Sequence, residues 1–344
     1  MVALLALLGV LVVAALLLWW AASGTTDSRS VSPGEVHVFA GATRAESGVG
    51  DELIVVGYNI AYGRGPGGDE AGPWTRDHIE RTLDALAAQI EATGAHVAAL
   101  QEVDLGAHRS HGIDQARYLT EKLGWSNYAC ALTWENNYVP FPYWPPARHY
   151  GRMKSGQCVL SRLPIRSSVR YRLPQPAANP FWYNWFYLHR ALQAVTIEAG
   201  GGRVVELVNV HLEAFDVPNR EAQVGILEDV LRGLETDRVV LVGDFNALPP
   251  GATRRHGFAD EPDADFREDK SMARIYAMDG LREALGPAGP DDPATFTFPA
   301  DAPSRRLDYL FVRPGFVVTE GRVLHDGPAL SDHRGIVARL RFAR

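Results

Sequence analysis

The chain opens on an apolar run, Val2–Ala22, that carries no charged residue and closes with Trp19 and Trp20. A helix of about 20 apolar residues is long enough to cross a bilayer, and a Trp pair is typical of the membrane interface. A secretory signal usually has a basic start and a shorter apolar core, although Ala21-Ala22-Ser23 also resembles a cleavage site. The pattern favours an uncleaved anchor over a cleaved signal, and both over a buried helix.

The next segment, residues 23–50, is rich in Ser, Thr and Gly and shows no sustained period, which predicts a linker. From residue 51 apolar runs alternate with helical spacings, as in Leu53–Ile60 and then Ile79, Leu83 and Ile90. Nothing in the composition divides residues 51–344 further, so we expect them to form one domain.

Alternating strands and helices predict an α/β fold, with two packed mixed sheets flanked by helices. We expect strands at 53–60, 95–100, 156–162, 189–199, 204–210, 239–243, 307–312, 317–324 and 335–342. The expected helices cover 77–92, 114–123 and 219–233, with short helices near 273–285. Asn219 is the predicted cap of the third helix, and Gly233 is placed to end it.

Charge and cysteine content narrow the function classes. With 34 Lys and Arg against 41 Asp and Glu, the net charge is −7, which disfavours a duplex-DNA binder without excluding a basic face. Cys130 and Cys158 are interpreted as free core cysteines rather than as a disulfide, and two lone cysteines are a poor basis for a metal site.

Two stretches are unusually aromatic, Tyr138–Tyr150 and Asn179–His189. Prolines exclude regular helix from the first. The rings either pack on one another or form a surface that contacts lipid or a stacked ligand. A smaller polar group, His108, Arg109 and His111, reads as a solvated loop more readily than as a substrate contact.

Polar residues recur at the ends of the expected strands. They are Asn59, Glu102, His211, Asp244, Asn246, Asp308, Asp332 and His333. Each alone is compatible with an ordinary turn or cap, but the full set in one chain indicates a single active site built at the mouths of rigid strands.

The chemistry of this set suits cleavage of a phosphate ester. Glu102 offers a carboxylate and Asn59 a neutral oxygen to a hard cation such as Mg²⁺. Asp244 can accept a proton from an attacking water that Asn246 orients, and His211 can donate to a nonbridging oxygen. Either Asp308 or Asp332 can fix the tautomer of His333.

The order of these motifs resembles the endonuclease/exonuclease/phosphatase superfamily. The resemblance rests on Tyr-Asn-Ile, Gln-Glu, Asn-Val-His-Leu, Gly-Asp-Phe-Asn, Leu-Asp-Tyr-Leu-Phe-Val and Ser-Asp-His, on the segment Gly156–Ile165, and on Arg220 and Gln223. It spans about residues 53 to 342 and implies a four-layer α/β/β/α sandwich and Mg²⁺-dependent phosphoester hydrolysis, with Mn²⁺ as an alternative metal.

By the same resemblance, Asn59, Glu102 and Asp332 lie at the metal. His211 binds phosphate, Asp244 and Asn246 position the nucleophile, and Asp308 orients His333.

The superfamily includes nucleases, inositol phosphate phosphatases and sphingomyelinases, and the catalytic set does not separate them. The apolar start, the acidic charge and the aromatic loops favour a phosphodiesterase acting on a lipid headgroup or another extracytoplasmic substrate. The protein would then be membrane-anchored with its catalytic domain outside the cytoplasm, or secreted. The alternatives are a metal-dependent nuclease that stacks single-stranded bases, a phosphatase of inositol or another soluble phosphate, and an inactive binding module. An inactive module would lack an acid or a histidine of the set, and none is missing.

Overall fold

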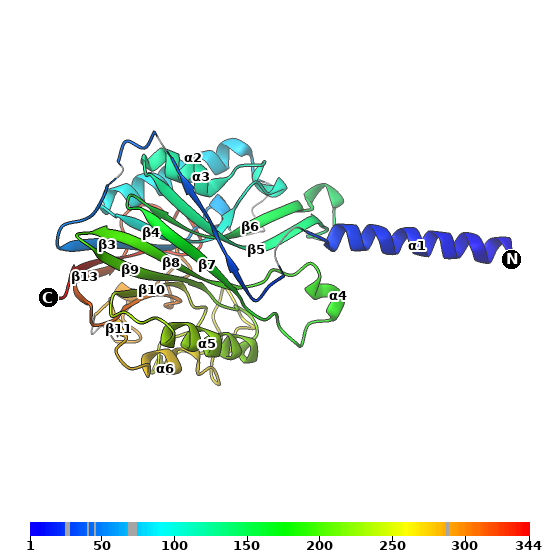
Figure 1. The fold of residues 1–344 in the computed structure, drawn as a ribbon. Helices are drawn as coiled ribbons and strands as arrows, with labels where there is room; N and C mark the ends of the chain where they lie inside the picture. Colours follow the sequence, from blue (N-terminus) through cyan, green and yellow to red (C-terminus); the bar gives the residue numbers. More distant parts are fainter. Residues whose placement is uncertain (25–27, 40, 45, 68–73, 287–288) are drawn as a thin grey trace.

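Two seven-stranded mixed sheets face each other, with helices on their outer faces, in a computed structural model that describes residues 1–344 except 25–27, 40, 45, 68–73 and 287–288 (Figure 1). This is the four-layer α/β/β/α sandwich that the sequence predicts. One sheet runs β1-β7-β8-β9-β10-β12-β11 and the other β13-β14-β3-β4-β6-β5-β2.

The first sheet contains β1 (Val31–Pro33), β7 (Ile165–Arg172), β8 (Ala191–Gly200), β9 (Arg203–His211), β10 (Val239–Asp244), β11 (Arg282–Glu283) and β12 (Asp308–Val312). The second contains β2 (Glu35–Val38), β3 (Glu52–Asn59), β4 (Val97–Asp104), β5 (Asn127–Val139), β6 (Gly151–Ser161), β13 (Phe316–Val323) and β14 (Ile336–Phe342). The helices are α1 (Val2–Ala22), α2 (Arg76–Ala92), α3 (Gln115–Leu123), α4 (Phe181–Asn184), α5 (Val217–Arg232) and α6 (Ser271–Tyr276).

Three apolar layers hold the sandwich together. Side chains such as Val55, Val242 and Leu310 fill the space between the sheets. The predicted stripe Ile79, Leu83, Leu86, Ala87 and Ile90 places α2 on the outer face of the β3–β4 sheet. Helices α5 and α6 cover the outer face of the other sheet. Burial of these faces is the main driving force for the fold.

A buried amide network also joins the two sheets. Gln101 Nε2 of β4 donates to Asn209 Oδ1 of β9 at 2.6 Å. Gln157 Nε2 of β6 donates to the Asn209 carbonyl at 2.7 Å. Because a buried amide must find partners, these contacts fix the relative position of the two sheets.

Some boundaries differ from the sequence prediction. Helix α5 begins earlier than Asn219 because the Asp216 side chain is the actual cap and accepts from the Asn219 N–H at 2.7 Å; Gly233 ends the helix as expected. Only α6 is helical within 273–285, and the two-residue strand β11 follows it. The sequence predicts no bounds for β5, although Cys130 falls in an apparent strand, and of β7 it indicates only the start, at the end of the Gly156–Ile165 motif.

The segment 23–50, expected to be a linker, is partly built into the sheets. Val31 to Pro33 pair with β7, and Glu35 to Val38 pair with β5, both antiparallel. These edge strands are short and mostly exposed, so they lack the apolar alternation that would reveal them. Residues 25–27, 40 and 45 of that expected linker lie outside the described residues.

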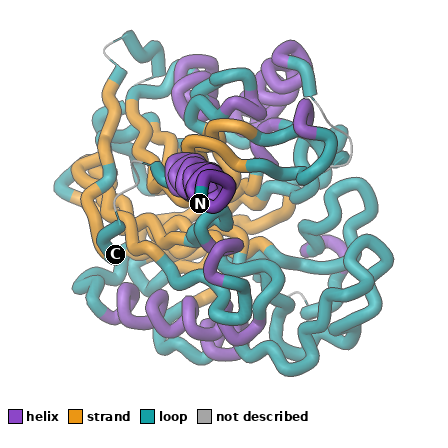
Figure 2. The backbone as a smooth tube through the Cα atoms, turned by 90° about the vertical axis from the view of Figure 1, so that its right-hand side faces the viewer, coloured by secondary structure: helices purple, strands orange, loops and turns teal. Residues whose placement is uncertain are grey.

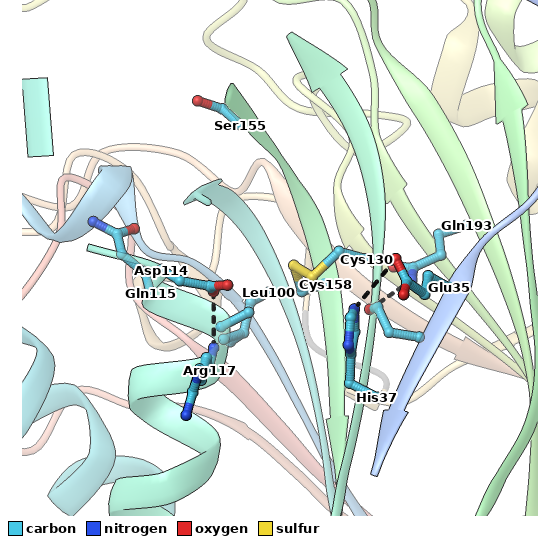
Figure 3. Close-up of a disulfide and its surroundings, with 12 residues drawn as sticks. Glu35, His37, Leu100, Asp114, Gln115, Arg117, Cys130, Ser155, Cys158 and Gln193 are labelled. Atoms are coloured by element: carbon cyan, nitrogen blue, oxygen red, sulfur yellow. Dashed lines mark hydrogen bonds and ion pairs between the residues drawn. A yellow bond between two sulfur atoms is a disulfide. The ribbon is translucent and has the colours of Figure 1, made fainter. Parts of the chain in front are cut away.

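The two cysteines form a disulfide, contrary to the prediction of free thiols (Figure 3). Cys130 of β5 and Cys158 of β6 are directly paired in antiparallel register, which brings their Cα atoms to 4.1 Å. The pairing of β5 with β6 creates this contact, and no local sequence signal reveals it.

Helix α1 projects from one end of the sandwich, and Figure 2 looks along it toward the two sheets. It is long and apolar enough to cross a membrane, and no other helix in the described part of the chain is. None of its residues is buried.

Candidate active site

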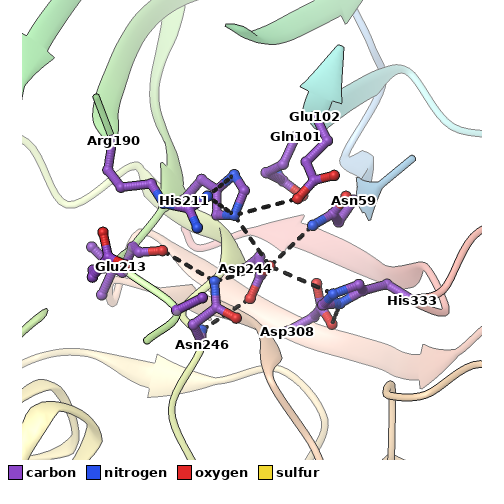
Figure 4. A network of polar contacts seen from close by, with 12 residues as sticks. Asn59, Gln101, Glu102, Arg190, His211, Glu213, Asp244, Asn246, Asp308 and His333 are labelled. Atoms are coloured by element: carbon purple, nitrogen blue, oxygen red, sulfur yellow. Dashed lines mark hydrogen bonds and ion pairs between the residues drawn. The ribbon is translucent and has the colours of Figure 1, made fainter. Parts of the chain in front are cut away.

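The predicted site residues come together at one edge of the sandwich because of strand order. Strands β9 and β10 run parallel, so His211 and Asp244 end side by side, and antiparallel β12 starts with Asp308 beside Asp244. In the facing sheet, parallel β3 and β4 bring Asn59 beside Gln101. Figure 4 shows the side chains converging from both sheets.

The backbone is unusual at two of these residues. Glu102 has φ of 55° and Asn246 has φ of 50°, in the left-handed region that non-glycine residues rarely adopt. Strand β4 continues past Glu102 to Asp104, and its pairing with β6 shifts register between Leu100 and Val103. Bulges of this kind re-aim side chains beside active sites, and here the irregularity lies at Glu102.

Asp244 lies at the centre of the hydrogen-bond network. Its Oδ2 accepts from Asn59 Nδ2 at 3.0 Å and from Asn246 Nδ2 at 3.3 Å, and its Oδ1 accepts from the Asn246 N–H at 2.9 Å. Nε2 of His211 lies 3.5 Å and Nε2 of His333 3.7 Å from Asp244 Oδ2. Three N–H donors from Asn59 and Asn246 therefore fix this buried carboxylate in position.

His333 is paired with Asp308 rather than with Asp332. Nδ1 of His333 donates to Asp308 Oδ2 at 2.8 Å, which resolves the alternative left open by the sequence. Asp332 is partly buried, and one of its carboxylate oxygens accepts from the Ser331 hydroxyl at 3.1 Å.

The protonation states of the two histidines differ because their neighbours differ. Burial lowers the pKa of His211 well below its usual value, and the Arg190 guanidinium lowers it further. For His333 burial also opposes the charged form, but Asp308 and Asp244 outweigh it and raise the pKa well above the usual value. His211 is therefore neutral and His333 cationic at neutral pH.

Two carboxyl groups of the site, Glu102 and Asp244, have raised pKa values. Burial, reinforced by the Asp332 charge, raises the pKa of Glu102, with Arg64 and Arg190 opposing it. Burial raises the pKa of Asp244 to about 7, and Asp308 adds to the rise while His333 opposes it. Desolvated carboxylates that repel each other are the setting in which a bound cation relieves the cost.

These residues therefore suit a divalent cation. Glu102 and Asp332 offer two carboxylates to one volume, and an all-oxygen donor set is what Mg²⁺ and Mn²⁺ prefer. Asn59 is less free than expected, because its Oδ1 already accepts from the Ala61 N–H at 3.1 Å, leaving one lone pair. A second set of ligand atoms, from Asp244, Asp308 and His333, lies within 4.8 Å of one another, but Asp308 and His333 are bonded to each other there.

Arg190 was missed by the sequence reasoning. It directly precedes β8, where Ala191 pairs with His211, and its Nη1 donates to His211 Nε2 at 2.5 Å. The Glu213 and Glu102 charges raise its pKa against the opposing effect of burial. The sequence shows only that Arg190 precedes an expected strand. The pairing of β8 with β9 is needed to show that its side chain reaches His211.

The group His108, Arg109 and His111, expected to be a solvated loop, is only partly so. His111 is exposed, whereas the Arg109 guanidinium is buried and donates to both carboxylate oxygens of Asp104 at 3.0 Å. Arg109 also lies 3.6 Å from the centre of the Tyr62 ring. The short loop turns Arg109 inward to neutralise Asp104, which follows Glu102 on β4.

A pocket of about 600 Å³ opens at the predicted site residues. Its floor includes Glu102, His211, Asp244 and His333, and its walls come from the two aromatic stretches, among them Tyr143, Tyr150, Trp182 and Phe186. Part of those stretches packs ring against ring, as Phe141 does with Tyr150. Other rings stay open to solvent, including Trp144 at 80% and Phe181 at 71% exposure. Mutual packing is therefore confirmed for part of the stretches, and contact of the exposed rings with lipid or a stacked ligand stays a prediction.

Comparisons with known proteins agree with this architecture. An endonuclease/exonuclease/phosphatase from Beutenbergia cavernae shares 25% identity and a TM-score of 0.62, over 86% of this chain and 72% of that one. The human Nocturnin catalytic domain with bound sulfate shares 17% identity (TM-score 0.57; 92% and 100% covered). Danio rerio TDP2 with a single-strand DNA product shares 15% identity (TM-score 0.54; 85% and 100% covered). At 17% and 15% identity, the Nocturnin and TDP2 structures show only that the fold is shared.

No curated protein matches the sequence. The sequence model of the Endonuclease/Exonuclease/phosphatase family matches residues 57–333, which include each of the eight predicted site residues. Members of that family are typically phosphoester hydrolases and are generally dependent on a divalent metal. The match covers well over half of the chain, and the chain therefore belongs to the Endonuclease/Exonuclease/phosphatase family.

Proposed function

We propose that this chain hydrolyses a phosphodiester in the headgroup of a membrane lipid, with Mg²⁺, or alternatively Mn²⁺, held by Glu102, Asp332 and Asn59. The observation that carries the proposal is the pocket in which a charged catalytic floor meets aromatic walls. Such a pocket matches a substrate with a phosphate at one end and an apolar body at the other.

Each residue of the site has a separate role in the proposed reaction. When bound, the cation would withdraw negative charge from the phosphoryl oxygens. Asp244 accepts the proton of an attacking water, which the Asn246 amide helps to orient. The His333 imidazolium, held by Asp308, favours the ionised form of Asp244 through its nearby positive charge, against the effect of burial. Arg190 and neutral His211 lie on the other side of Asp244 and provide N–H donors for phosphoryl oxygens.

A hydrolysis panel tests this function. The purified chain in mild detergent is given mixed micelles of sphingomyelin, phosphatidylcholine or phosphatidylinositol phosphates, then plasmid DNA, single-stranded DNA and a bis-aryl phosphodiester, each with Mg²⁺, Mn²⁺ or EDTA. We expect metal-dependent release of a phosphorylated headgroup from at least one lipid, and its loss in Asp244→Asn. Cleavage of nucleic acid alone, or activity unaffected by EDTA, would contradict the proposal.

A nuclease acting on single strands is the second candidate. The fold is shared with a TDP2 that holds a single-strand DNA product, and aromatic walls can stack bases. The net charge of −7 weighs against it. Soluble and inositol phosphates in the same panel test the remaining phosphatase alternative.

We also propose that α1 is an uncleaved anchor and that the domain lies outside the cytoplasm. The Cys130–Cys158 disulfide supports an oxidising compartment. Mass spectrometry of the protein extracted from membranes tests the first point, and protease protection in intact cells tests the second. A mature chain beginning after Ala22 would indicate a secreted enzyme instead.

A further inference from the structure

Helix α1 is fixed to the catalytic domain where it emerges. The Asn137 side chain donates to the Trp20 carbonyl at 3.0 Å, and the Asn137 N–H donates to the Ser23 carbonyl at 2.9 Å. Asn136 Nδ2 reaches the Ala22 carbonyl at 2.8 Å and the Trp185 carbonyl at 3.0 Å. Two consecutive residues of β5 thus hold the end of α1, and one of them also holds the segment after α4.

This attachment determines the depth of α4 in any membrane that α1 crosses. Residues Ala15, Leu18 and Trp19 of α1 line the same groove as Phe181 of α4 and Trp185, which directly follows α4. Figure 1 shows α4 near the end of α1 that meets the sandwich. With 21 residues, α1 is about 31 Å long at 1.5 Å per residue, close to the roughly 30 Å hydrocarbon core. Since Ala15 lies about 10 Å from the end of α1, α4 lies within about 10 Å of the membrane interface.

The exposed side chains at that level suit this environment. Phe181, Trp182 and Trp185 of the α4 segment are 71%, 50% and 47% exposed, and Tyr143 and Trp144 of the β5–β6 loop are 66% and 80% exposed. Aromatic rings with polar edges concentrate at membrane interfaces. A soluble protein has no reason to gather so many open rings beside an apolar helix.

The groove between α1 and α4 leads toward the active site. It has a volume of about 670 Å³, and Trp134 and Tyr187 line both it and the catalytic pocket. At its base the Arg172 guanidinium contacts His189 and donates to the Ser28 carbonyl at 3.0 Å, with no carboxylate partner among the described residues. The groove thus combines an apolar wall with the Arg172 guanidinium, which has no carboxylate partner in the part of the chain that the structure describes; Glu135 also lines the groove.

We propose that this groove is a lateral port, through which a phospholipid of the bilayer that anchors α1 enters the catalytic pocket. An acyl chain lies along the last two turns of α1, and the anionic phosphate is drawn past Arg172 toward the pocket. The proposal rests on the proposed function for the final step, hydrolysis, but occupation of the groove by lipid does not depend on it.

Two matched variants test the route in the full chain, reconstituted in nanodiscs of the lipid that the panel identifies as substrate. Ala15→Trp fills the groove, whereas the neighbouring Ala14→Trp adds the same ring outside the groove lining. We expect Ala15→Trp to slow hydrolysis of nanodisc lipid about tenfold or more, as an overfilled site does, and Ala14→Trp to leave it unchanged. Both should cleave a soluble bis-aryl phosphodiester at the normal rate. Equal lipid hydrolysis by both variants would overturn the proposal.

A binding experiment separates failure of the port from failure of the function. Phosphatidylcholine with a photoactivatable diazirine in its acyl chain is incorporated into the nanodiscs, and crosslinked peptides are mapped by mass spectrometry. We expect crosslinks in 15–22 and 181–187 that Ala15→Trp removes and Ala14→Trp retains. Crosslinks without any lipid hydrolysis would support the port and contradict the proposed function. The absence of crosslinks at these segments in the wild-type chain would overturn the port whatever the substrate.

Discussion

His333 donates through Nδ1 to Asp308 Oδ2 at 2.8 Å, while its Nε2 lies 3.7 Å from Asp244 Oδ2. One imidazole therefore joins two buried carboxylates, and both raise its pKa. The Oδ1 atom of Asp308 has no hydrogen-bond partner among the described residues. Asp308 thus acts on the chemistry through His333, as a positioning residue.

We expect Asp308→Asn to lower kcat at least about 100-fold and to change KM little, because it removes the charge that keeps His333 oriented and protonated. Combined with His333→Ala, its effect should be less than additive. Steady-state kinetics on the bis-aryl phosphodiester measure both, with the exposed Asp229→Asn as control. Fully additive losses would show that the two residues act separately.

The arrangement of the site was predictable because it follows strands that are visible in the sequence. The apolar runs of β3, β9 and β10 are interior strands buried on both faces, and each ends in a polar residue. Their hydrophobic content marks them without any knowledge of pairing. The polar residues at their ends then converge because parallel neighbours end at the same edge.

The remaining features depend on pairing, which the sequence does not display. The Cys130–Cys158 bond requires the β5–β6 register, and the position of Arg190 requires the pairing of β8 with β9. Strands β1 and β2 add backbone hydrogen bonds at sheet edges and little apolar burial, so their composition reads as a linker. Asp104, which turns Arg109 inward, is buried and follows the bulge between Leu100 and Val103. No local sequence pattern predicts this bulge.

If Glu102 is a metal ligand, removal of its charge should lower the activity. Glu102→Gln should lower activity about 100-fold or more, because it removes a charge from the proposed coordination shell while keeping the shape of the side chain. Isothermal titration should show weaker Mn²⁺ binding. The matched change Glu198→Gln lies on the exposed part of β8 and should leave both unchanged. Wild-type affinity for Mn²⁺ in Glu102→Gln would remove Glu102 from the metal site.

Arg109 should be required mainly for stability. Arg109→Ala leaves the fully buried Asp104 carboxylate without its cation, and breaking a buried pair in this way costs about 3–5 kcal/mol. Arg81→Ala breaks an exposed pair with Asp77 and should cost less than about 1 kcal/mol. Urea unfolding of the full chain in detergent measures both. A stable Arg109→Ala protein that fails to hydrolyse lipid would instead identify Arg109 as a substrate contact.

The disulfide should stabilise the domain by constraining its unfolded state. The bond closes a loop with a sequence separation of 28, for which chain entropy predicts about 3.6 kcal/mol. Replacing both Cys130 and Cys158 by Ala should lower the melting temperature, and dithiothreitol should lower that of the wild type but not of the double variant. A wild-type protein insensitive to reductant, with free thiols by mass spectrometry, would mean that the bond does not form.

His189 should make stability depend on pH in the acid range. Burial, followed by the charges of Arg172 and Arg170, lowers its pKa to about 4 from the ordinary 6.5. Below pH 6.5 the unfolded chain therefore binds a proton that the folded chain does not. The stabilisation is complete above about pH 6.5 and declines as the pH falls toward 4, by up to about 3 kcal/mol.

The variant His189→Gln removes this titration while keeping a polar side chain of similar size. Its melting temperature should fall less between pH 7 and pH 4.5 than that of the wild type, because the other acid-sensitive groups are shared by both proteins. Differential scanning calorimetry of the two full chains in the same detergent measures the difference. Parallel curves over that range would show that His189 titrates alike in the folded and unfolded chains, and that the groove beside α1 is open to water at this residue.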